Sequence, residues 1–257
     1  MNISGNTVLI TGGGSGIGRA LAEAFQAQGN QVIIAGRRQQ VLEETVAANP
    51  GMKSIALDIE DPESIRSFGE RVVKEDPALN VVIHNAGIMR PENLLDPAGD
   101  LATADATITT NFLGPIRLNA ALLPHLLKQP KATIMTVSSG LGFIPLALTP
   151  TYCATKAAIH SYSQSLRYQL KDTSVEVIEL APPYVQTELM GSAQASDPRA
   201  MPLREFIDEV MNILKTQPDV REVLVKRVKP LRFAELNGVE KYAAFFKSFN
   251  DAVPAPH

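Results

Sequence analysis

Seven short runs rich in apolar and β-branched residues recur along this chain, and longer stretches with a helical pattern separate them. The runs are nearly continuous in apolar residues rather than alternating, which is typical of strands buried on both faces. We expect strands at Thr7–Ile10, Gln31–Ala35, Lys53–Leu57, Val81–His84, Ala132–Val137, Val175–Glu179 and Glu222–Val225. The alternation predicts an α/β fold with a doubly wound, mostly parallel sheet of seven strands.

Helical patterns fill the gaps between these strands. We expect helices over Gly18–Gln28, from Asp61-Pro62-Glu63 onward, within Leu101–Leu127, over Tyr152–Leu170 and over Arg204–Lys215. Asp61 has the character of an N-cap, followed by a first-turn proline and an acidic residue near the positive helix end. No repeat or linker divides the 257 residues, so we interpret residues 1–257 as one domain.

Two segments depart from the alternation. Residues 184–203 are rich in Gly, Ser, Ala and Pro, and a long connection of this kind is either a mobile functional loop or disorder. We interpret it as a substrate loop. In the tail, Tyr242, Phe245, Phe246 and Phe249 form one apolar stripe at helical spacing, which predicts an aromatic helix over about 239–250.

Composition excludes several function classes. A formal net charge of −3 disfavours a general nucleic-acid-binding protein, which is normally basic. The single cysteine, Cys153, suits a reducing compartment, and the four histidines show no spacing typical of zinc sites, so we expect no metal. No apolar run approaches the roughly 18 residues of a membrane span, and the first strand begins too early for a signal peptide. We therefore expect a cytoplasmic protein with no membrane partner.

A glycine-rich turn follows the first expected strand and opens the first helix. Gly12, Gly16 and Gly18, with Ser15 and Ile17 between them, form a G-x3-G-x-G pattern. Glycines permit a tight turn and close backbone approach, and a helix N-terminus offers unpaired N–H groups to a pyrophosphate. A merely structural turn that needs positive φ is the alternative. The turn lacks the Gly-Lys-Ser/Thr ending of a P-loop, which argues against a P-loop NTPase.

The second strand is followed by Gly36-Arg37-Arg38. An acidic residue in this place would accept hydrogen bonds from the adenosine ribose, whereas arginine accommodates a 2′-phosphate. Gly36 cannot play the acidic part, so we expect at least one of the arginines, Arg37 first, to bind the 2′-phosphate of NADP(H). Two solvated arginines at a helix start are the alternative.

Tyr152 and Lys156 lie four residues apart on an expected helix and so share one face. Ser139 ends a buried strand thirteen residues earlier, and Asn85-Ala86-Gly87 follows the fourth strand. Together with the glycine turn, these residues resemble the short-chain dehydrogenase/reductases over about Asn6 to Thr187. The segment Tyr152–Lys156 and the tail Arg227–Phe233 are similar to the DltE-like oxidoreductases of teichoic-acid D-alanylation operons.

The resemblance implies a single-domain Rossmann fold and a role for each matching residue. Asn111, Ser139, Tyr152 and Lys156 would form the catalytic tetrad. The cofactor would be bound by Gly12, Ser15, Gly16, Ile17, Gly18, Arg37, Arg38, Asp58, Asn85, Ala86, Gly87, Tyr152, Lys156 and Thr187. Within that set Asp58 would touch the adenine edge, and Thr187 would bond the nicotinamide carboxamide. His84 departs from the family's usual residue before Asn-Ala-Gly, and we expect it to be buried and bonded to backbone.

The tetrad makes chemical sense because a phenol with a pKa of roughly 10 must be tuned to exchange a proton at neutral pH. A lysine ammonium about 4 Å away would contribute on the order of 4 kcal/mol, or roughly three pKa units. Tyr152 would then act as general acid or base, Ser139 would bond the reacting oxygen, and Asn111 would support a water relay to Lys156.

The sequence thus predicts an NADP(H)-dependent oxidoreductase that transfers a hydride to or from a carbonyl/alcohol substrate. The alternative is a non-catalytic NADP(H)-binding redox sensor or regulator. Residues Leu141–Leu148, Met89–Pro91 and Tyr184–Met201 would build a largely apolar substrate site. The two long helices, Leu101–Leu127 and Tyr152–Leu170, are expected to pair copies of the chain into a homodimer or homotetramer.

Overall fold

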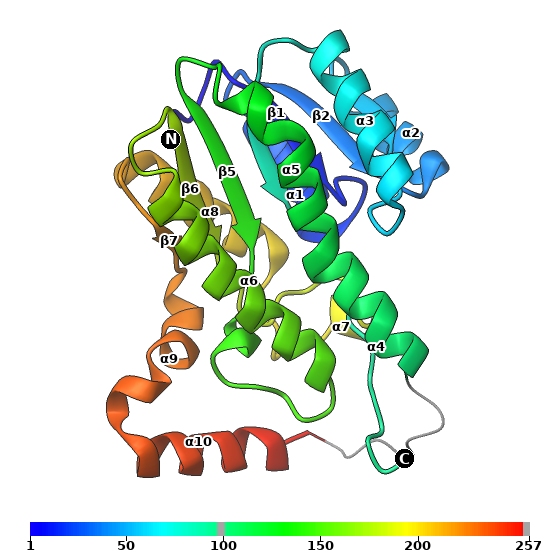
Figure 1. The fold of residues 1–257 in the computed structure, drawn as a ribbon. Helices are drawn as coiled ribbons and strands as arrows, with labels where there is room; N and C mark the ends of the chain where they lie inside the picture. Colours follow the sequence, from blue (N-terminus) through cyan, green and yellow to red (C-terminus); the bar gives the residue numbers. More distant parts are fainter. Residues whose placement is uncertain (97–100, 254–257) are drawn as a thin grey trace.

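The expected sheet is present. The computed structural model describes residues 1–96 and 101–253 (Figure 1), and in these ranges seven parallel strands form one sheet in the order β3-β2-β1-β4-β5-β6-β7. The strands are β1 Thr7–Thr11, β2 Gln31–Gly36, β3 Lys53–Ala56, β4 Leu79–His84, β5 Ala132–Val137, β6 Val175–Leu180 and β7 Glu222–Val223. Every pairing is parallel. The predicted fold class is confirmed, and β7 is two residues shorter than expected.

Three helices cover one face of the sheet: α1 Gly16–Ala27, α2 Gln39–Ala48 and α8 Leu203–Thr216. The apolar residues of α1 and α8 recur at helical spacing, so that Phe25 and Phe206, for example, are fully buried against the strands. Helix α2 was not predicted. It buries only Leu42 and Thr45, and this short contact leaves a weak apolar pattern in the sequence.

The opposite face is covered by α3 Pro62–Glu75, α5 Gly114–Leu126 and α6 Pro150–Gln169 (Figure 1). Helix α3 begins as the sequence predicts, because the Asp61 carboxylate accepts a hydrogen bond from the Glu63 N–H at 3.0 Å. Both faces of the sheet are therefore shielded from water, which explains why the strands consist almost entirely of apolar residues.

The helix predicted within Leu101–Leu127 is interrupted. It consists of α4 Leu101–Ile108, a π-helical turn η1 over Thr109–Leu113, and α5. Gly114 follows the π-turn and lies against the chain after β3, where a Cβ atom would come within 2.6 Å of Ile59 Cγ1. The interruption thus lets the helix pass close to Ile59 and sets the direction of Asn111 within the π-turn.

The segment from 184 to 203 is folded rather than disordered. Val185 pairs with Met201 in a parallel bridge, and a short helix α7, Ser192–Ala195, lies between them. The buried Gln194 side chain donates to the Val185 carbonyl at 2.8 Å and closes the segment on itself.

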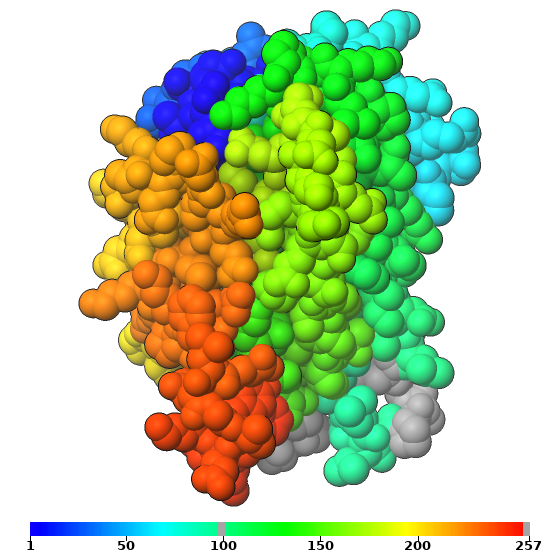
Figure 2. All heavy atoms as spheres, turned by 60° about the vertical axis from the view of Figure 1, so that its left-hand side comes forward, coloured from blue at the N-terminus to red at the C-terminus, as the bar shows by residue number. Residues whose placement is uncertain are grey.

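Beyond β7 the chain leaves the sheet through a 3-10 turn η3 Lys226–Val228, α9 Lys229–Arg232 and a second 3-10 turn η4 Ala234–Asn237, and it ends in α10 Val239–Asp251. Figure 1 shows α10 running beneath the loop that leads into α6, and in Figure 2 this orange-to-red segment lies beside the green middle of the chain. The predicted aromatic helix is confirmed. Among the described residues no helix is both long and apolar enough to cross a membrane.

Candidate active site at the carboxyl ends of the strands

The glycine turn between β1 and α1 is tightly constrained. Gly12 and Gly16 have positive φ angles of 66° and 53°. A Cβ atom on Gly12 would lie 3.0 Å from the Ala86 Cα atom, and one on Gly18 would lie 2.3 Å from the Gly12 carbonyl oxygen. Glycine is therefore required for both conformation and space, and the turn leaves the N-terminus of α1 open to an anionic group.

Asn85 fastens the end of β4 to this turn. Its side-chain amide donates to the carbonyl oxygens of Thr11 at 3.0 Å and Gly12 at 3.3 Å. The Thr11 hydroxyl in turn accepts from the backbone N–H groups of Asn85 and Ala86, each at 3.1 Å. Asn85 and Ala86 are thus held beside the glycine turn.

The two arginines after β2 have different partners. The Arg38 guanidinium donates to the Ser15 hydroxyl at 2.9 Å, at the start of α1. Arg37 forms an ion pair with Glu60 at 2.7 Å, and Glu60 also accepts from Thr110 at 2.8 Å. Both arginines are exposed, but the Ser15 contact gives Arg38 the more direct position beside the glycine turn.

Asp58 and Thr187 flank the same edge of the sheet. The Asp58 carboxylate accepts from the Glu60 N–H at 3.0 Å, and the Asp58 N–H donates to the Ser64 hydroxyl at 3.0 Å. Thr187 lies opposite the start of α1, since a Cβ atom on Gly16 would be 3.6 Å from the Thr187 Cβ atom. Thr187 therefore lies at the glycine turn, whereas Asp58 lies after β3, beside Glu60 and Ser64.

Ser139, Tyr152 and Lys156 are gathered and buried, with exposed fractions of 7%, 6% and 5%. Ser139 follows β5, whereas Tyr152 and Lys156 lie on α6. The Ser139 side chain lies close enough to Tyr152 to act on the pKa of its phenol. The Lys156 ammonium group donates to the Val137 carbonyl at 2.8 Å and lies 5.5 Å from the centre of the Tyr152 ring. The end of β5 and the first turns of α6 thus bring these three buried residues together.

Burial shifts the pKa values of Tyr152 and Lys156 in opposite directions. It raises the pKa of Tyr152 to about 12, although the Ser139 side chain acts in the opposite direction. It lowers the pKa of Lys156 to about 8. The expectation that Lys156 lowers the pKa of Tyr152 by several units does not hold in this structure, because the ammonium is bound to the Val137 carbonyl and burial dominates. At neutral pH Tyr152 is a protonated phenol, suited to giving a proton.

Asn111 lies in the π-turn η1 and forms hydrogen bonds with Ile88 and Thr155. Its amide oxygen accepts from the Ile88 N–H at 2.8 Å, while its amide nitrogen donates to the Ile88 carbonyl at 2.9 Å and to the Thr155 hydroxyl at 3.2 Å. Because Thr155 precedes Lys156 on α6, the amide links the chain after β4 to the helix that carries the tyrosine and the lysine.

Glu92 is a residue that the sequence analysis missed. Its buried carboxylate accepts from the Thr151 N–H at 3.0 Å and from the Thr151 hydroxyl at 2.6 Å, one residue before Tyr152. A negative charge at the N-terminus of α6 is favourable. No local pattern pointed to it, since its partners lie 59 residues away in the chain.

His84 is buried, as expected, but it bonds to a side chain rather than to backbone. Its Nε2 atom lies 2.7 Å from the Asn119 amide oxygen, and its Nδ1 atom has no partner. Burial lowers the pKa of His84 to about 4, so the ring is neutral at pH 7. The neutral ring donates from Nε2 to the amide oxygen, and this bond connects β4 to α5 through Asn119.

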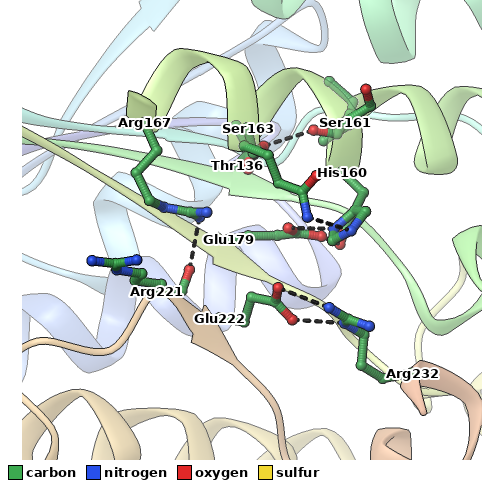
Figure 3. Close-up of polar contacts among 12 residues, drawn as sticks. Thr136, His160, Ser161, Ser163, Arg167, Glu179, Arg221, Glu222 and Arg232 are labelled. Carbon is green, nitrogen blue, oxygen red and sulfur yellow. Dashed lines mark hydrogen bonds and ion pairs between the residues drawn. The ribbon is translucent and has the colours of Figure 1, made fainter. Parts of the chain in front are cut away.

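A second polar network joins α6, β6 and β7 (Figure 3). Glu179, at the end of β6, accepts from the Ser138 hydroxyl at 2.5 Å and lies 2.8 Å from the His160 Nδ1 atom. Glu222 nearby is bound by Arg232 at 2.7 and 3.0 Å. His160, Glu179 and Glu222 lie close enough together to be weighed as metal ligands. Their carboxylates already have Arg232, His160 and Ser138 as partners, so we interpret the cluster as structural support for the end of β5.

Comparisons with known proteins match this architecture. A family model described as short chain dehydrogenase matches residues 6–198. The chain is 42% identical to an uncharacterized oxidoreductase, DltE, of Bacillus subtilis over 237 residues, which is 91% of this chain and 93% of that protein. A short-chain dehydrogenase from Sphingobium yanoikuyae in complex with NADPH superimposes with a TM-score of 0.78, at 25% identity and 98% coverage of both chains. A short-chain dehydrogenase/reductase from Burkholderia phymatum in complex with NAD gives a TM-score of 0.79 at 17% identity, covering 100% and 99% of the two chains.

Proposed function

The chain belongs to the short-chain dehydrogenase family of oxidoreductases, and from this premise we propose that it transfers a hydride between NADP(H) and a carbonyl/alcohol substrate. One observation carries the proposal: Ser139, Tyr152 and Lys156 converge in a buried corner at the edge of the sheet that also holds the glycine turn. Ligands of open α/β sheets bind outside the carboxyl ends of the strands.

The residues at this edge fit a nicotinamide dinucleotide. Gly12 and Gly16 have the positive φ angles that bring backbone close to a pyrophosphate, and α1 directs its free N–H groups toward the same place. Thr187, opposite the start of α1, and Lys156 would hold the nicotinamide end. When bound, the reduced cofactor supplies the hydride.

Tyr152 would supply the proton for reduction. With its pKa near 12 the phenol is protonated at neutral pH, and it would donate its proton to the carbonyl oxygen as the carbonyl carbon receives the hydride. Ser139 would hydrogen-bond the same oxygen. In the direction of alcohol oxidation the same atoms would run in reverse.

A preference for NADP(H) follows from the residues after β2. Gly36 offers no carboxylate to the adenosine ribose, and the exposed guanidinium of Arg38 lies at the glycine turn. Charge-assisted bonds to a 2′-phosphate would favour NADP(H) over NAD(H). The NADPH complex of the Sphingobium yanoikuyae relative is in line with this choice.

A panel of uncharged aldehydes, ketones and quinones, assayed by the loss of NADPH absorbance, tests the proposal. We expect turnover of at least one member that depends on NADPH. A protein that binds NADPH tightly but turns over none of the panel would instead be a redox sensor or regulator.

A further inference from the structure

The segment after β7 is anchored at two points before α10 begins. Arg232 makes a bidentate ion pair with Glu222 of β7, at 2.7 and 3.0 Å (Figure 3). The same guanidinium lies 4.7 Å from the centre of the Phe143 ring, and Phe143 packs edge-on against His160 of α6. Because Phe143 belongs to the loop between β5 and α6, the segment is fixed to that loop.

Helix α10 is then fastened along the same loop by side-chain hydrogen bonds. The Tyr242 hydroxyl donates to the Phe143 carbonyl at 3.2 Å, near the start of the helix. Near its end, the Asn250 amide accepts from the Ala147 N–H at 2.6 Å and donates to the Pro145 carbonyl at 3.1 Å. Bonds at both ends hold the helix in one position relative to the loop.

This position brings the last turn of α10 to the apolar cluster that contains Tyr152. Tyr152, Cys153 and Leu146 form a buried cluster, and the apolar side chains packed against it include Phe249 and Val253 from the tail. The others are Met89, Leu141 and Leu148. The Phe249 ring is also held edge-on by Phe245, with ring centres 6.1 Å apart. The cluster thus gathers apolar side chains from three parts of the chain around the Tyr152 ring.

We propose that Phe249 is a specificity-determining residue, which contacts the apolar part of an uncharged aldehyde or ketone whose carbonyl reaches Tyr152. This inference rests on the proposed function and names the substrate class. A carboxylate or phosphate on the substrate would lose hydrating water against Phe249, Leu146 and Leu148, so uncharged carbonyl compounds are favoured over charged ones. An alkyl chain would gain up to about fourfold in kcat/KM for each methylene buried there.

The test compares kcat/KM for unbranched aldehydes of increasing length with NADPH, in the wild-type protein, Phe249→Ala and Phe246→Ala. Phe246 is the matched control, since it lies on the same helix and is 36% exposed outside the Tyr152 cluster. We expect the ratio of kcat/KM between a long and a short aldehyde to fall about tenfold or more in Phe249→Ala and to stay unchanged in Phe246→Ala.

A further variant, Phe249→Leu, separates substrate contact from loss of folding, because it keeps most of the apolar volume and should recover much of the ratio. NADPH dissociation constants should be equal in all four proteins. Equal length ratios in active Phe249→Ala and Phe246→Ala would overturn the assignment of Phe249 and leave the proposed function intact. Absence of turnover in the wild-type protein would overturn both.

Discussion

Tyr152 and Lys156 lie one helical turn apart on α6, and burial acts on their two protonation equilibria in opposite directions. Their spacing in the sequence correctly placed them on one face of a helix. The sequence could not show that Lys156 donates to the Val137 carbonyl, because that contact depends on how β5 ends against α6. For this reason the charge effect expected between the two residues was overestimated.

The pH dependence of stability should report the buried lysine. Between its folded pKa of about 8 and its usual value of 10.5, the unfolded chain binds a proton that the folded protein has released. The free energy of unfolding should therefore rise with pH in this window, by about 2 kcal/mol between about pH 8 and about pH 10. Above about pH 10 the raised pKa of Tyr152 acts the other way.

Denaturant unfolding of the wild-type protein and of Lys156→Met across this pH range checks the prediction. The variant should lack the rise, because it has no group to deprotonate. Parallel profiles for the two proteins would show that Lys156 keeps an ordinary pKa in the folded state.

The preference for NADPH over NADH should also depend on single residues. Arg38→Ala should raise the dissociation constant of NADPH by about tenfold to a hundredfold and leave that of NADH nearly unchanged, because only NADPH carries the 2′-phosphate. Arg37→Ala should have a smaller effect, since Arg37 is engaged by Glu60. Fluorescence titrations with NADPH and NADH measure these dissociation constants in the parent protein and in both variants. Equal affinities of the parent protein for NADPH and NADH would refute the NADP assignment.

At the scale of elements, strands were easier to predict than the breaks in helices. Buried strands can be recognised in the sequence because almost all of their residues are apolar. The predicted ranges match β1 to β6 to within about two residues at each end. The π-turn η1 leaves no comparable trace in the sequence, and the close approach of Gly114, which follows it, to Ile59 involves a residue 55 positions earlier. The role of Asn111 was taken from the family resemblance, and its contact with Ile88 is visible only in the structure.

The buried Glu92 carboxylate binds Thr151 in the first turn of α6. Glu92→Ala would leave the Thr151 N–H and hydroxyl without their acceptor, at a cost of about 1–3 kcal/mol in the free energy of unfolding. We expect kcat to fall more than NADPH affinity, since Tyr152 follows directly. Urea unfolding and steady-state kinetics measure both effects, and Glu92→Gln, which keeps an acceptor, should recover part of each. Unchanged stability and kcat in Glu92→Ala would exclude this role.

For the whole molecule, the order of the elements was sufficient to predict one parallel sheet with the candidate site along its carboxyl edge. The tail was not predictable in the same way. Its aromatic stripe indicated a helix, but the partners of Tyr242, Phe249 and Asn250 lie about a hundred residues away. A periodic apolar pattern shows that one face of a helix must be buried. Only the folded structure shows which residues bury it.

Assembly remains a prediction at this scale. Leu101 and Ile108 on α4 and Tyr168 on α6 are exposed by 75%, 40% and 72%, on the helices expected to pair two copies. Phe246 on α10 also remains partly uncovered. Burial of these side chains between copies favours a homodimer or homotetramer. Light scattering at micromolar concentration should show a multiple of 27.7 kDa, and a particle of 27.7 kDa alone would refute the prediction.

The central claim is that the Tyr152 hydroxyl moves the proton, and Tyr152→Phe tests it most directly. The change removes one oxygen atom from a buried ring, so the fold and the NADPH site should persist. We expect kcat to fall by a factor of about a hundred or more, while the dissociation constant of NADPH changes little. A kcat that remains within about tenfold of the wild-type value would contradict the account.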